Sequence, residues 1–319
     1  MELTSGFADQ INDFLRLRME LGYQQSTYVT AMRGFDRYCA LFHPADRIIT
    51  DTIAYGWIDY ERNCGRRGIS QKLTAIRTFA RYIQSMGEIA YAIPDKILPA
   101  RRRFVPNIFT DDELSRFFRQ VDADAVNLWR RKIIPNTYPV LFRLIYTCGL
   151  RPGEGFRAMR DDLDLRTRTL FIRETKRHKQ RVVSLSPDMA GMMEAFVKKR
   201  DASQLRSKYL FPGREGRHLH VGWTDIYFWK SWCAIHPGIP EEKVPGARIY
   251  DLRHRFASAT IQQWVDGGGD LYSLLPKLRV YMGHASLEQT LYYVHLLPDR
   301  LRASAAIDWN TLDAIIPEV

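Results

Sequence analysis

The chain has 319 residues, enough for about two domains of ordinary size, and 45% of them are hydrophobic. Its 47 lysines and arginines outnumber its 36 aspartates and glutamates, which gives a formal net charge of +11. This composition can build a buried core, which excludes a disordered polycation, and no apolar run approaches the ~20 residues of a transmembrane helix, which excludes an integral membrane protein.

The cysteines and the beginning of the chain predict a cytoplasmic location. The four cysteines lie far apart, at positions 39, 64, 148 and 233, which excludes a disulfide scaffold or a zinc knuckle and fits a reducing compartment. The first residues, MELTSGFADQINDF, lack the basic region and the apolar region of a secretory signal.

The positive charge has two possible interpretations: it keeps the protein soluble, or it attracts a polyanion such as DNA. Residues 1–106 carry 15 basic and 11 acidic side chains, and residues 107–319 carry 32 and 25. The densest stretch, 166–181, has seven lysines and arginines against one glutamate. Because both halves are basic, a partner that contacts both of them is expected to be a long polyanion.

The first hundred residues are predicted to be helical. Apolar residues recur at helical spacing over 7–15 and 28–42, and Ser70 is a plausible N-cap for a third helix. Arg77 and Arg81 lie one turn apart on that helix, and Arg66 and Arg67 precede it. These four arginines are either ordinary surface residues or part of a helix face that contacts phosphates.

A basic linker is predicted where three prolines follow within 13 residues, Pro94, Pro99 and Pro106. Prolines end helices, and the run Arg101, Arg102 and Arg103 keeps this segment solvated. The run is by default a solvated charge cluster, although it is also suited to following a DNA backbone.

The second domain is predicted to begin with a capping box formed by Thr110 and Glu113. Helical periodicity breaks at 168–185, where two short β-prone runs flank a basic turn and predict an antiparallel hairpin. The tip of this hairpin carries Lys176, Arg177, His178 and Lys179. Further helices are expected at about 138–148, 187–200, 223–233, 250–265 and 287–296.

The predicted fold class is therefore mainly α with a small antiparallel β-sheet (α+β). Residues 1–98 form a helical domain, 99–108 the linker, and 109–319 a larger domain with a C-terminal tail. In the tail, Leu312, Ile315 and Ile316 form an apolar stripe that either docks on a neighbouring protomer or packs on its own domain.

Separated segments of the second domain place polar residues in apolar surroundings. Arg151 lies at a helix junction, after a Gly-Leu pair and before Pro152 and Glu154. Arg253 projects from a helix with a buried stripe. Near the end, Ser286 and Gln289 predict a capping box, and the apolar stripe of that helix leaves Tyr292 and Tyr293 outside the core.

In their order and spacing, these segments resemble the tyrosine recombinase (phage-type integrase) family. The resemblance covers the second domain and rests on five motifs: GLRPGE at 149–154, TKRHKQRVVSLS at 175–186, DLRH at 251–254, GHASLEQT at 283–290 and Tyr-Val-His at 293–295. It implies a helical DNA-binding domain followed by a catalytic domain. Motif by motif, it implies the catalytic residues Arg151, Lys176, Arg253, His284 and the nucleophile Tyr293.

The resemblance implies a site-specific recombinase that cuts and rejoins DNA through a 3′-phosphotyrosine. Two arginines suit the phosphate oxygens because they are planar, bidentate and permanently charged, and a covalent phosphotyrosine conserves the bond energy. No metal or cofactor is required, and Glu154 is expected to orient an active-site side chain.

The implied partners are double-stranded DNA, further copies of the chain as a tetramer on paired sites, and an accessory DNA-bending factor, with no membrane contact. The implied location is the nucleoid. The expected DNA contacts are Arg66, Arg67, Arg77, Arg81, Arg101, Arg102, Arg103, Arg177 and Lys179.

The chain departs from the family pattern at Tyr250, where the motif His-x-x-Arg commonly has its histidine. A neutral phenol is a poor base, so we include position 250 in the site and expect slower or differently assisted chemistry. His254 is expected to be structural, with a role as replacement base less favoured. The segment that precedes Gly283 is longer than usual, which resembles integrases of bacterial mobile elements.

Two alternatives stay open at the level of sequence. A type IB topoisomerase shares the arginines, the lysine and the tyrosine, although the short chain and small first domain favour a recombinase. A catalytically attenuated or inactive DNA-binding protein of the same fold is supported by Tyr250 alone.

Overall fold

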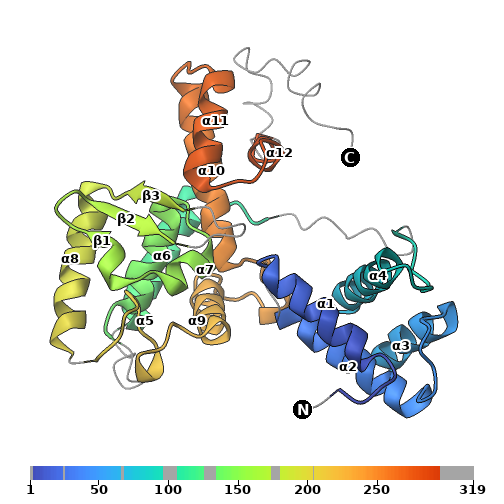
Figure 1. Ribbon diagram of the computed structural model, residues 1–319. Helices are drawn as coiled ribbons and strands as arrows, with labels where there is room; N and C mark the ends of the chain where they lie inside the picture. The colour runs from blue at the N-terminus through green and yellow to red at the C-terminus, as the bar shows by residue number, and fades with distance from the viewer. Residues whose placement is uncertain are drawn as a thin grey trace. The chain divides into compact units, whose positions relative to one another are not determined.

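The computed structural model describes residues 3–23, 26–65, 68–95, 106–125, 134–173, 180–203 and 205–294. The chain divides into two compact units, residues 1–104 and 105–319 (Figure 1). The predicted linker at 99–108 falls at this division, but residues 96–105 lie outside the described ranges, so its finer boundaries stay predictions.

The first unit is built from four helices, α1 (Ala8–Glu20), α2 (Ser26–Phe42), α3 (Asp51–Asn63) and α4 (Ile69–Ser85). The fourth helix packs against the other three, around an aromatic cluster of Phe35, Trp57 and Phe79. Helix α3 was not predicted from the sequence. The prediction of Ser70 as an N-cap was wrong, because α4 begins at Ile69 and its N-cap is Gly68. That glycine has a φ of 80°, a left-handed conformation that favours glycine.

The second unit is larger and also mainly helical. Its helices are α5 (Asp111–Ala125), α6 (Thr137–Cys148), α7 (Pro152–Arg157), α8 (Pro187–Ala202), α9 (Val221–Ala234), α10 (Ile249–Asp266), α11 (Leu271–Met282) and α12 (Glu288–Leu291). Short 3-10 helices lie at Arg160–Asp162, Arg214–Gly216 and Glu241–Lys243. The expected capping box forms at the start of α5, where the N–H of Glu113 donates to Thr110 at 3.2 Å and that of Thr110 to Glu113 at 2.8 Å.

A three-stranded antiparallel sheet lies in this unit, in the order β1 (Leu163–Asp164), β2 (Thr169–Ile172), β3 (Arg181–Ser184). The predicted hairpin is therefore confirmed as the pair β2 and β3, and Leu170 lies opposite Val183. Both side chains are buried, whereas Val182 faces outward, as strand alternation requires. The tip at 174–179 lies outside the described residues.

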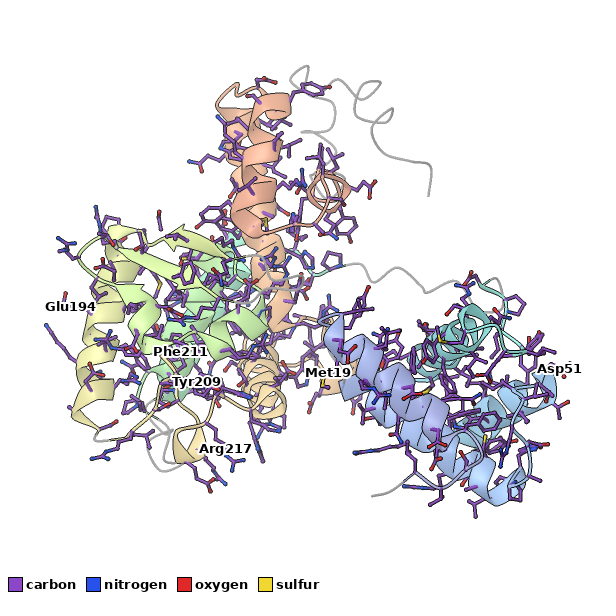
Figure 2. All side chains as sticks on the ribbon, in the orientation of Figure 1. Met19, Asp51, Glu194, Tyr209, Phe211 and Arg217 are labelled. Atoms are coloured by element: carbon purple, nitrogen blue, oxygen red, sulfur yellow. The ribbon has the colours of Figure 1, made fainter. Side chains whose placement is uncertain are left out.

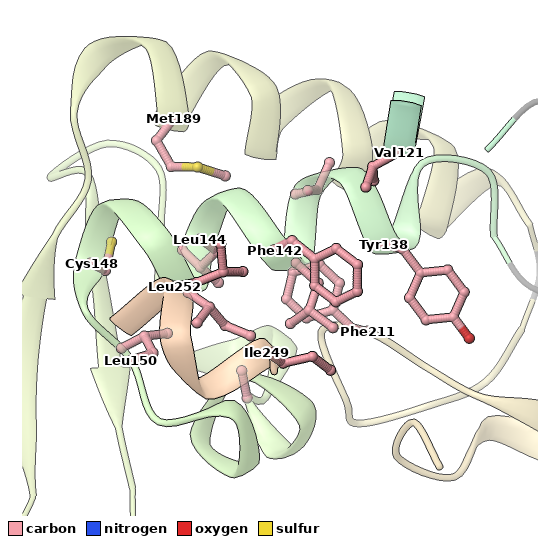
Figure 3. Close-up of a cluster of buried hydrophobic side chains, with 14 of the residues drawn as sticks. Val121, Tyr138, Phe142, Leu144, Cys148, Leu150, Met189, Phe211, Ile249 and Leu252 are labelled. Carbon is pink, nitrogen blue, oxygen red and sulfur yellow. The ribbon is translucent and has the colours of Figure 1, made fainter. Parts of the chain in front are cut away.

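Helix α6 is the centre of the core, because it packs against α5, α7, α8 and α10. A helix with neighbours on several sides has to be apolar around most of its circumference. The sequence of α6, TYPVLFRLIYTC, meets this requirement. Figure 3 shows Phe142, Leu144 and Cys148 of α6 next to Ile249 and Leu252 of α10. In contrast, Glu194 and Arg217 project from the surface of the same unit (Figure 2).

A second buried cluster joins α10, α11 and α12 at the end of the described chain. It contains Ile261, Leu275, Met282 and Leu291. The segment before Gly283 was expected to be a long connection, but part of it forms α11, which has Pro276 inside it. No helix in the described part of the chain is long and apolar enough to span a membrane.

Candidate active site

Arg151 occupies the turn between α6 and α7. Helix α6 ends at Gly149, which has a φ of 59° and whose added Cβ would meet Phe256 at 2.4 Å. Pro152 then begins α7, so Arg151 is the N-cap residue between two fixed helix ends. This local structure holds the backbone of Arg151 in one place, as the sequence analysis predicted.

The side chain of Arg151 is anchored at both ends of its guanidinium group. Its Nη1 donates to Oε1 of Glu154 at 2.8 Å, and its Nη2 donates to the carbonyl oxygen of Gly283 at 2.7 Å. The contact to Gly283 spans more than a hundred residues of sequence and joins α7 to the end of α11.

Arg253 comes from α10 and is completely buried, with 0% of its surface exposed. Its Nη1 donates to the carbonyl oxygen of Gly149 at 2.6 Å, and its Nη2 donates to that of Met282 at 2.8 Å. Its Nε has no hydrogen-bond partner. Burial lowers the pKa of this guanidinium group. A buried cation whose hydrogen-bond partners are all neutral groups is costly, and this favours a site that receives an anion.

A buried carboxylate joins Arg151 to a third arginine. Glu154 lies almost fully buried on α7, and its oxygens accept from Nη1 and Nη2 of Arg181 at 3.1 and 2.7 Å. Burial alone would raise the pKa of Glu154, but the hydrogen bonds and charges of Arg181 and Arg151 outweigh it and hold that pKa below its usual range. Glu154 therefore contacts Arg151, one of the expected site residues, and two arginines, Arg151 and Arg181, share this one carboxylate.

Tyr293 lies against the arginines and is only 3% exposed. This corrects the expectation that both tyrosines lie outside the core, which came from an idealised helix over 287–296. Helix α12 instead ends at Leu291, and the chain turns at 292–294. Burial raises the pKa of Tyr293 to about 12, although Arg253 and Arg151 act in the opposite direction. At neutral pH the phenol keeps its proton and requires an acceptor to become a nucleophile.

His284 follows the left-handed Gly283 that ends α11 and is buried beside Tyr293, with the two rings 5.8 Å apart. Its Nδ1 lies 2.7 Å from the hydroxyl of Thr290. Burial, assisted by the charges of Arg253 and Arg151, lowers the pKa of His284 to about 3, so the imidazole is neutral. The predicted capping box of this segment does not form, since Gln289 accepts from the N–H of Ala285 rather than from Ser286.

Tyr250 and His254 lie one turn apart on α10, with their rings 5.0 Å apart. Tyr250 acts to raise the pKa of Tyr293, which indicates that the two side chains lie near each other. His254 was expected to be structural, but its Nδ1 lies 3.1 Å from the hydroxyl of Tyr293.

Arg77 is not placed as the sequence analysis expected. It is buried, its Nε and Nη2 donate to the carbonyl oxygens of Ile93 and Pro94, and its Nη1 pairs with Asp95 at 2.8 Å. These contacts hold the segment after α4 and leave little of the side chain for a phosphate. Arg81, by contrast, is 55% exposed and pairs with Asp95 at the surface.

The remaining expected residues lie outside the described part of the chain. They are Lys176, Arg66, Arg67, Arg101, Arg102, Arg103, Arg177 and Lys179. The apolar stripe of the tail at 312–316 lies outside it as well.

Arg181 is the residue that sequence reasoning missed. It begins β3, two residues before the buried Val183, so strand alternation places both side chains on the inner face. An arginine on a buried face requires a partner, and that requirement was a usable signal. No spacing rule, however, identifies Glu154 as the partner.

Residues 107–300 match the phage integrase family, which is more than half of the chain. The chain belongs to the phage integrase family. This membership confirms the resemblance from which the site residues were chosen. The match covers α5 to α12 and thus every described residue of the site.

Relatives of this phage integrase family member extend over nearly its whole length. An integrase/recombinase of Sinorhizobium fredii, y4rB, is 28% identical over 306 residues, 93% of this chain and 95% of that protein. The tyrosine recombinase XerC of Oceanobacillus iheyensis is 26% identical over 251 residues, 76% of this chain and 74% of that protein.

Solved structures share the fold at low sequence identity. The Tn1549 transposon integrase in complex with a circular-intermediate DNA is 13% identical, with a TM-score of 0.62 over 89% of this chain and 94% of that one. A lambda integrase dimer bound to a core site is 14% identical, with a TM-score of 0.59 over 89% of this chain and 94% of that one. The mainly helical fold with a small sheet is thus the fold of known integrases.

Proposed function

We propose that this protein is a site-specific DNA recombinase that cleaves and rejoins DNA through a 3′-phosphotyrosine at Tyr293. The observation that carries the proposal is the convergence of Arg151 and Arg253 beside the hydroxyl of Tyr293. These residues come from the turn before α7, from α10 and from the turn after α12. Membership of the phage integrase family and the integrase/recombinase relatives support the same activity.

The two arginines are proposed to hold the phosphodiester. During in-line attack, negative charge builds on the nonbridging oxygens, and guanidinium groups fixed in advance stabilise that charge without reorganising. The structure holds both groups in this way, because each donates to a backbone carbonyl near Gly283. Glu154 and Arg181 fix the orientation of Arg151 from the other side.

The proton transfers are assigned to the remaining site residues. Lys176, on the tip between β2 and β3, is proposed to donate a proton to the leaving 5′-oxygen. The neutral His284 is proposed to hydrogen-bond to the reacting phosphate, and Tyr250 to contact the same group from α10. The reaction requires no metal in this scheme, since the arginines supply the positive charge.

Contacts to the rest of the duplex are proposed to come from both units. Arg66, Arg67 and Arg81 of the first unit, the run at 101–103, and Arg177 with Lys179 on the hairpin are suited to bind the phosphate backbone. We further propose a tetramer on two paired DNA sites. A lambda integrase tetramer bound to a Holliday junction shares the fold, with a TM-score of 0.59, which supports this assembly. An accessory DNA-bending factor and association with the nucleoid belong to the same proposal.

The test is the formation of a covalent protein–DNA complex. Labelled duplexes that tile the DNA on both sides of the gene are incubated with the protein and then denatured with SDS. We expect one duplex to yield a complex that survives denaturation and is released by protease. If every duplex that binds is recovered free of protein, the chain is a non-catalytic DNA-binding protein. Relaxation of any supercoiled plasmid, without a specific site, would instead indicate topoisomerase activity.

A further inference from the structure

A hydrogen bond links the proposed nucleophile to a residue outside the expected catalytic set. Nδ1 of His254 lies 3.1 Å from the hydroxyl oxygen of Tyr293. His254 directly follows Arg253 on α10, so the helix that holds the phosphate-binding arginine also presents this imidazole to the phenol. Such a contact can orient the hydroxyl and receive its proton.

The protonation state of His254 allows it to accept a proton. Burial, together with the charges of Arg248 and Arg253, lowers the pKa of His254 to about 4, so the ring is neutral at physiological pH. A neutral imidazole has one N–H and one lone pair. Its Nε2 lies 4.0 Å from Oδ1 of the buried Asp251, on the preceding turn of the helix. A carboxylate on that side favours the tautomer with the proton on Nε2, which leaves Nδ1 free to accept from Tyr293.

The other groups around the phenol are less suited to take a proton. Nδ1 of His284 is engaged with the hydroxyl of Thr290 at 2.7 Å. Tyr250 carries a phenol, a side chain that is a poor base. Arg253 is a permanent cation and has no lone pair to offer. Among the described residues, His254 is thus the neutral base in contact with the reacting oxygen.

We propose that His254 is a further catalytic residue, which orients the hydroxyl of Tyr293 and accepts its proton during cleavage; this inference rests on the proposed function. In the forward step, the oxygen of Tyr293 bonds to phosphorus while its O–H bond breaks and the proton moves to Nδ1. The bond from phosphorus to the 5′-oxygen breaks, and that oxygen takes the electron pair and a proton from Lys176. On rejoining, the 5′-oxygen bonds to phosphorus and its proton returns to Lys176. The bond from phosphorus to the oxygen of Tyr293 breaks, and Nδ1 of His254 gives the proton back to that oxygen.

Binding of DNA should make His254 a better base than it is in the free protein. The bound phosphodiester brings a negative charge against Arg253, which reduces the repulsion between that arginine and an imidazolium ion. The buried carboxylate of Asp251 then stabilises the charged ring. Several titratable or charged groups face His254. From α10 they are Tyr250, Asp251, Arg253 and the N-cap residue Arg248, and from the segments packed against it they are His284, Tyr292 and Tyr293.

The experiment compares two leaving groups in single-turnover cleavage by the full chain. The substrate is a nicked duplex built on the site recovered by covalent trapping, with either an ordinary phosphodiester or a 5′-bridging sulfur at the cleaved position. Sulfur leaves without a proton, so it removes the need for a general acid but not for a base. The variants are His254→Asn, which keeps a hydrogen-bonding side chain without a base, and Lys176→Ala.

We expect His254→Asn to cleave both substrates roughly 100-fold or more slowly than wild type, the usual contribution of a general base. Lys176→Ala should be slow on the phosphodiester and close to wild type on the sulfur substrate. His220→Asn is the matched control, because His220 is an exposed N-cap residue of α9 and asparagine caps helices well. Either of two results would overturn the proposal. One is that His254→Asn cleaves the phosphodiester at the wild-type rate, and the other is that the sulfur substrate restores its cleavage rate.

A second variant separates proton transfer from folding. His254→Ala is assayed with added imidazole after its DNA affinity has been shown to match that of wild type. Cleavage should rise with the concentration of the neutral form of imidazole, which replaces the missing base. No rise in a variant that still binds DNA would overturn the role of His254 as base. If wild type itself forms no covalent complex with any duplex, it is the proposed function that fails.

Discussion

Arg151 and Arg253 donate to the carbonyl oxygens of two consecutive residues, Gly283 at 2.7 Å and Met282 at 2.8 Å. The end of α11 therefore sets the spacing of the two guanidinium groups. Gly283 has a φ of 66°, and an added Cβ would lie 3.0 Å from Arg181 and 3.5 Å from Arg151. The left-handed backbone favours glycine at this turn, and a side chain there would also crowd Arg181.

Arg253 is expected to matter for the reaction and not for the stability of the free protein. Arg253→Met should reduce covalent complex formation roughly 100-fold or more, as for other groups that stabilise a charged transition state. Because the substitution removes a buried cation that lacks a carboxylate, it should lower the free energy of unfolding by less than about 1 kcal/mol, or raise it. Denaturant titration and SDS trapping check the two expectations. Loss of several kcal/mol with trapping intact would show that Arg253 is structural.

Glu154 is expected to contribute both to stability and to the orientation of Arg151. Glu154→Gln keeps the shape but leaves Arg151 and Arg181 without a counter-charge, so unfolding should become easier by about 1–3 kcal/mol. The rate of cleavage should fall as well. The control is Glu194→Gln on α8, an exposed residue paired with Lys198, where a change below about 0.5 kcal/mol is expected. Equal effects at the two positions would contradict the role given to Glu154.

The pH dependence of stability should report the buried histidines. The pKa of His284 is lowered to about 3 and that of His254 to about 4, whereas in the unfolded chain both titrate near 6.5. Below the unfolded value, the unfolded state binds protons that the native state does not, so stability falls as the pH falls. Each histidine should contribute about 1.4 kcal/mol per pH unit between those limits.

The measurement is the free energy of unfolding at several pH values from 7.5 to about 4.5, in the range where the two histidines differ between states. His284→Asn should reduce the slope of unfolding free energy against pH by the contribution of one histidine, about 1.4 kcal/mol per pH unit. Glu154 affects stability at lower pH. Because its pKa is lowered in the native state, its contribution to stability is complete above about pH 4.3 and is lost as the pH falls below that value. A stability that is constant between pH 7 and 5 would contradict the burial of neutral histidines.

Two arginines of α4 should separate stability from DNA binding. Arg77→Ala removes two hydrogen bonds to backbone carbonyls and the ion pair with Asp95, and should lower the free energy of unfolding of the first unit by about 2 kcal/mol. Arg81→Ala should cost less than about 1 kcal/mol, because its ion pair is exposed. If Arg81 contacts a phosphate, its loss should reduce the salt slope of DNA affinity by about 1. If Arg77→Ala instead reduced the salt slope and Arg81→Ala lowered the stability, Arg77 would be the phosphate contact.

Much of this architecture was predictable, because local rules decide it. The capping box of Thr110 and Glu113, the αL glycine that ends α6, and the hairpin of β2 and β3 all follow from neighbouring residues. Motif spacing also brought together Arg151, Arg253, His284 and Tyr293, which are distant in sequence.

The rest depends on tertiary contacts that sequence patterns do not encode. Helix α11 forms although it contains Pro276, because its leucines complete the buried cluster with α10. Arg77 looks like a surface arginine until the chain after α4 folds back onto it. The contact from His254 to Tyr293 arises because α12 is short and the chain turns at 292–294, whereas a continuous helix was expected.

We expect Tyr293, and not its neighbour Tyr292, to become joined to DNA. The most direct measurement compares Tyr293→Phe with Tyr292→Phe in the SDS trapping assay on the same nicked duplex, with DNA affinity measured for both. We expect Tyr293→Phe to bind DNA like wild type and to form no covalent complex, while Tyr292→Phe still forms one. Covalent complex from Tyr293→Phe, or its loss in Tyr292→Phe alone, would contradict the account.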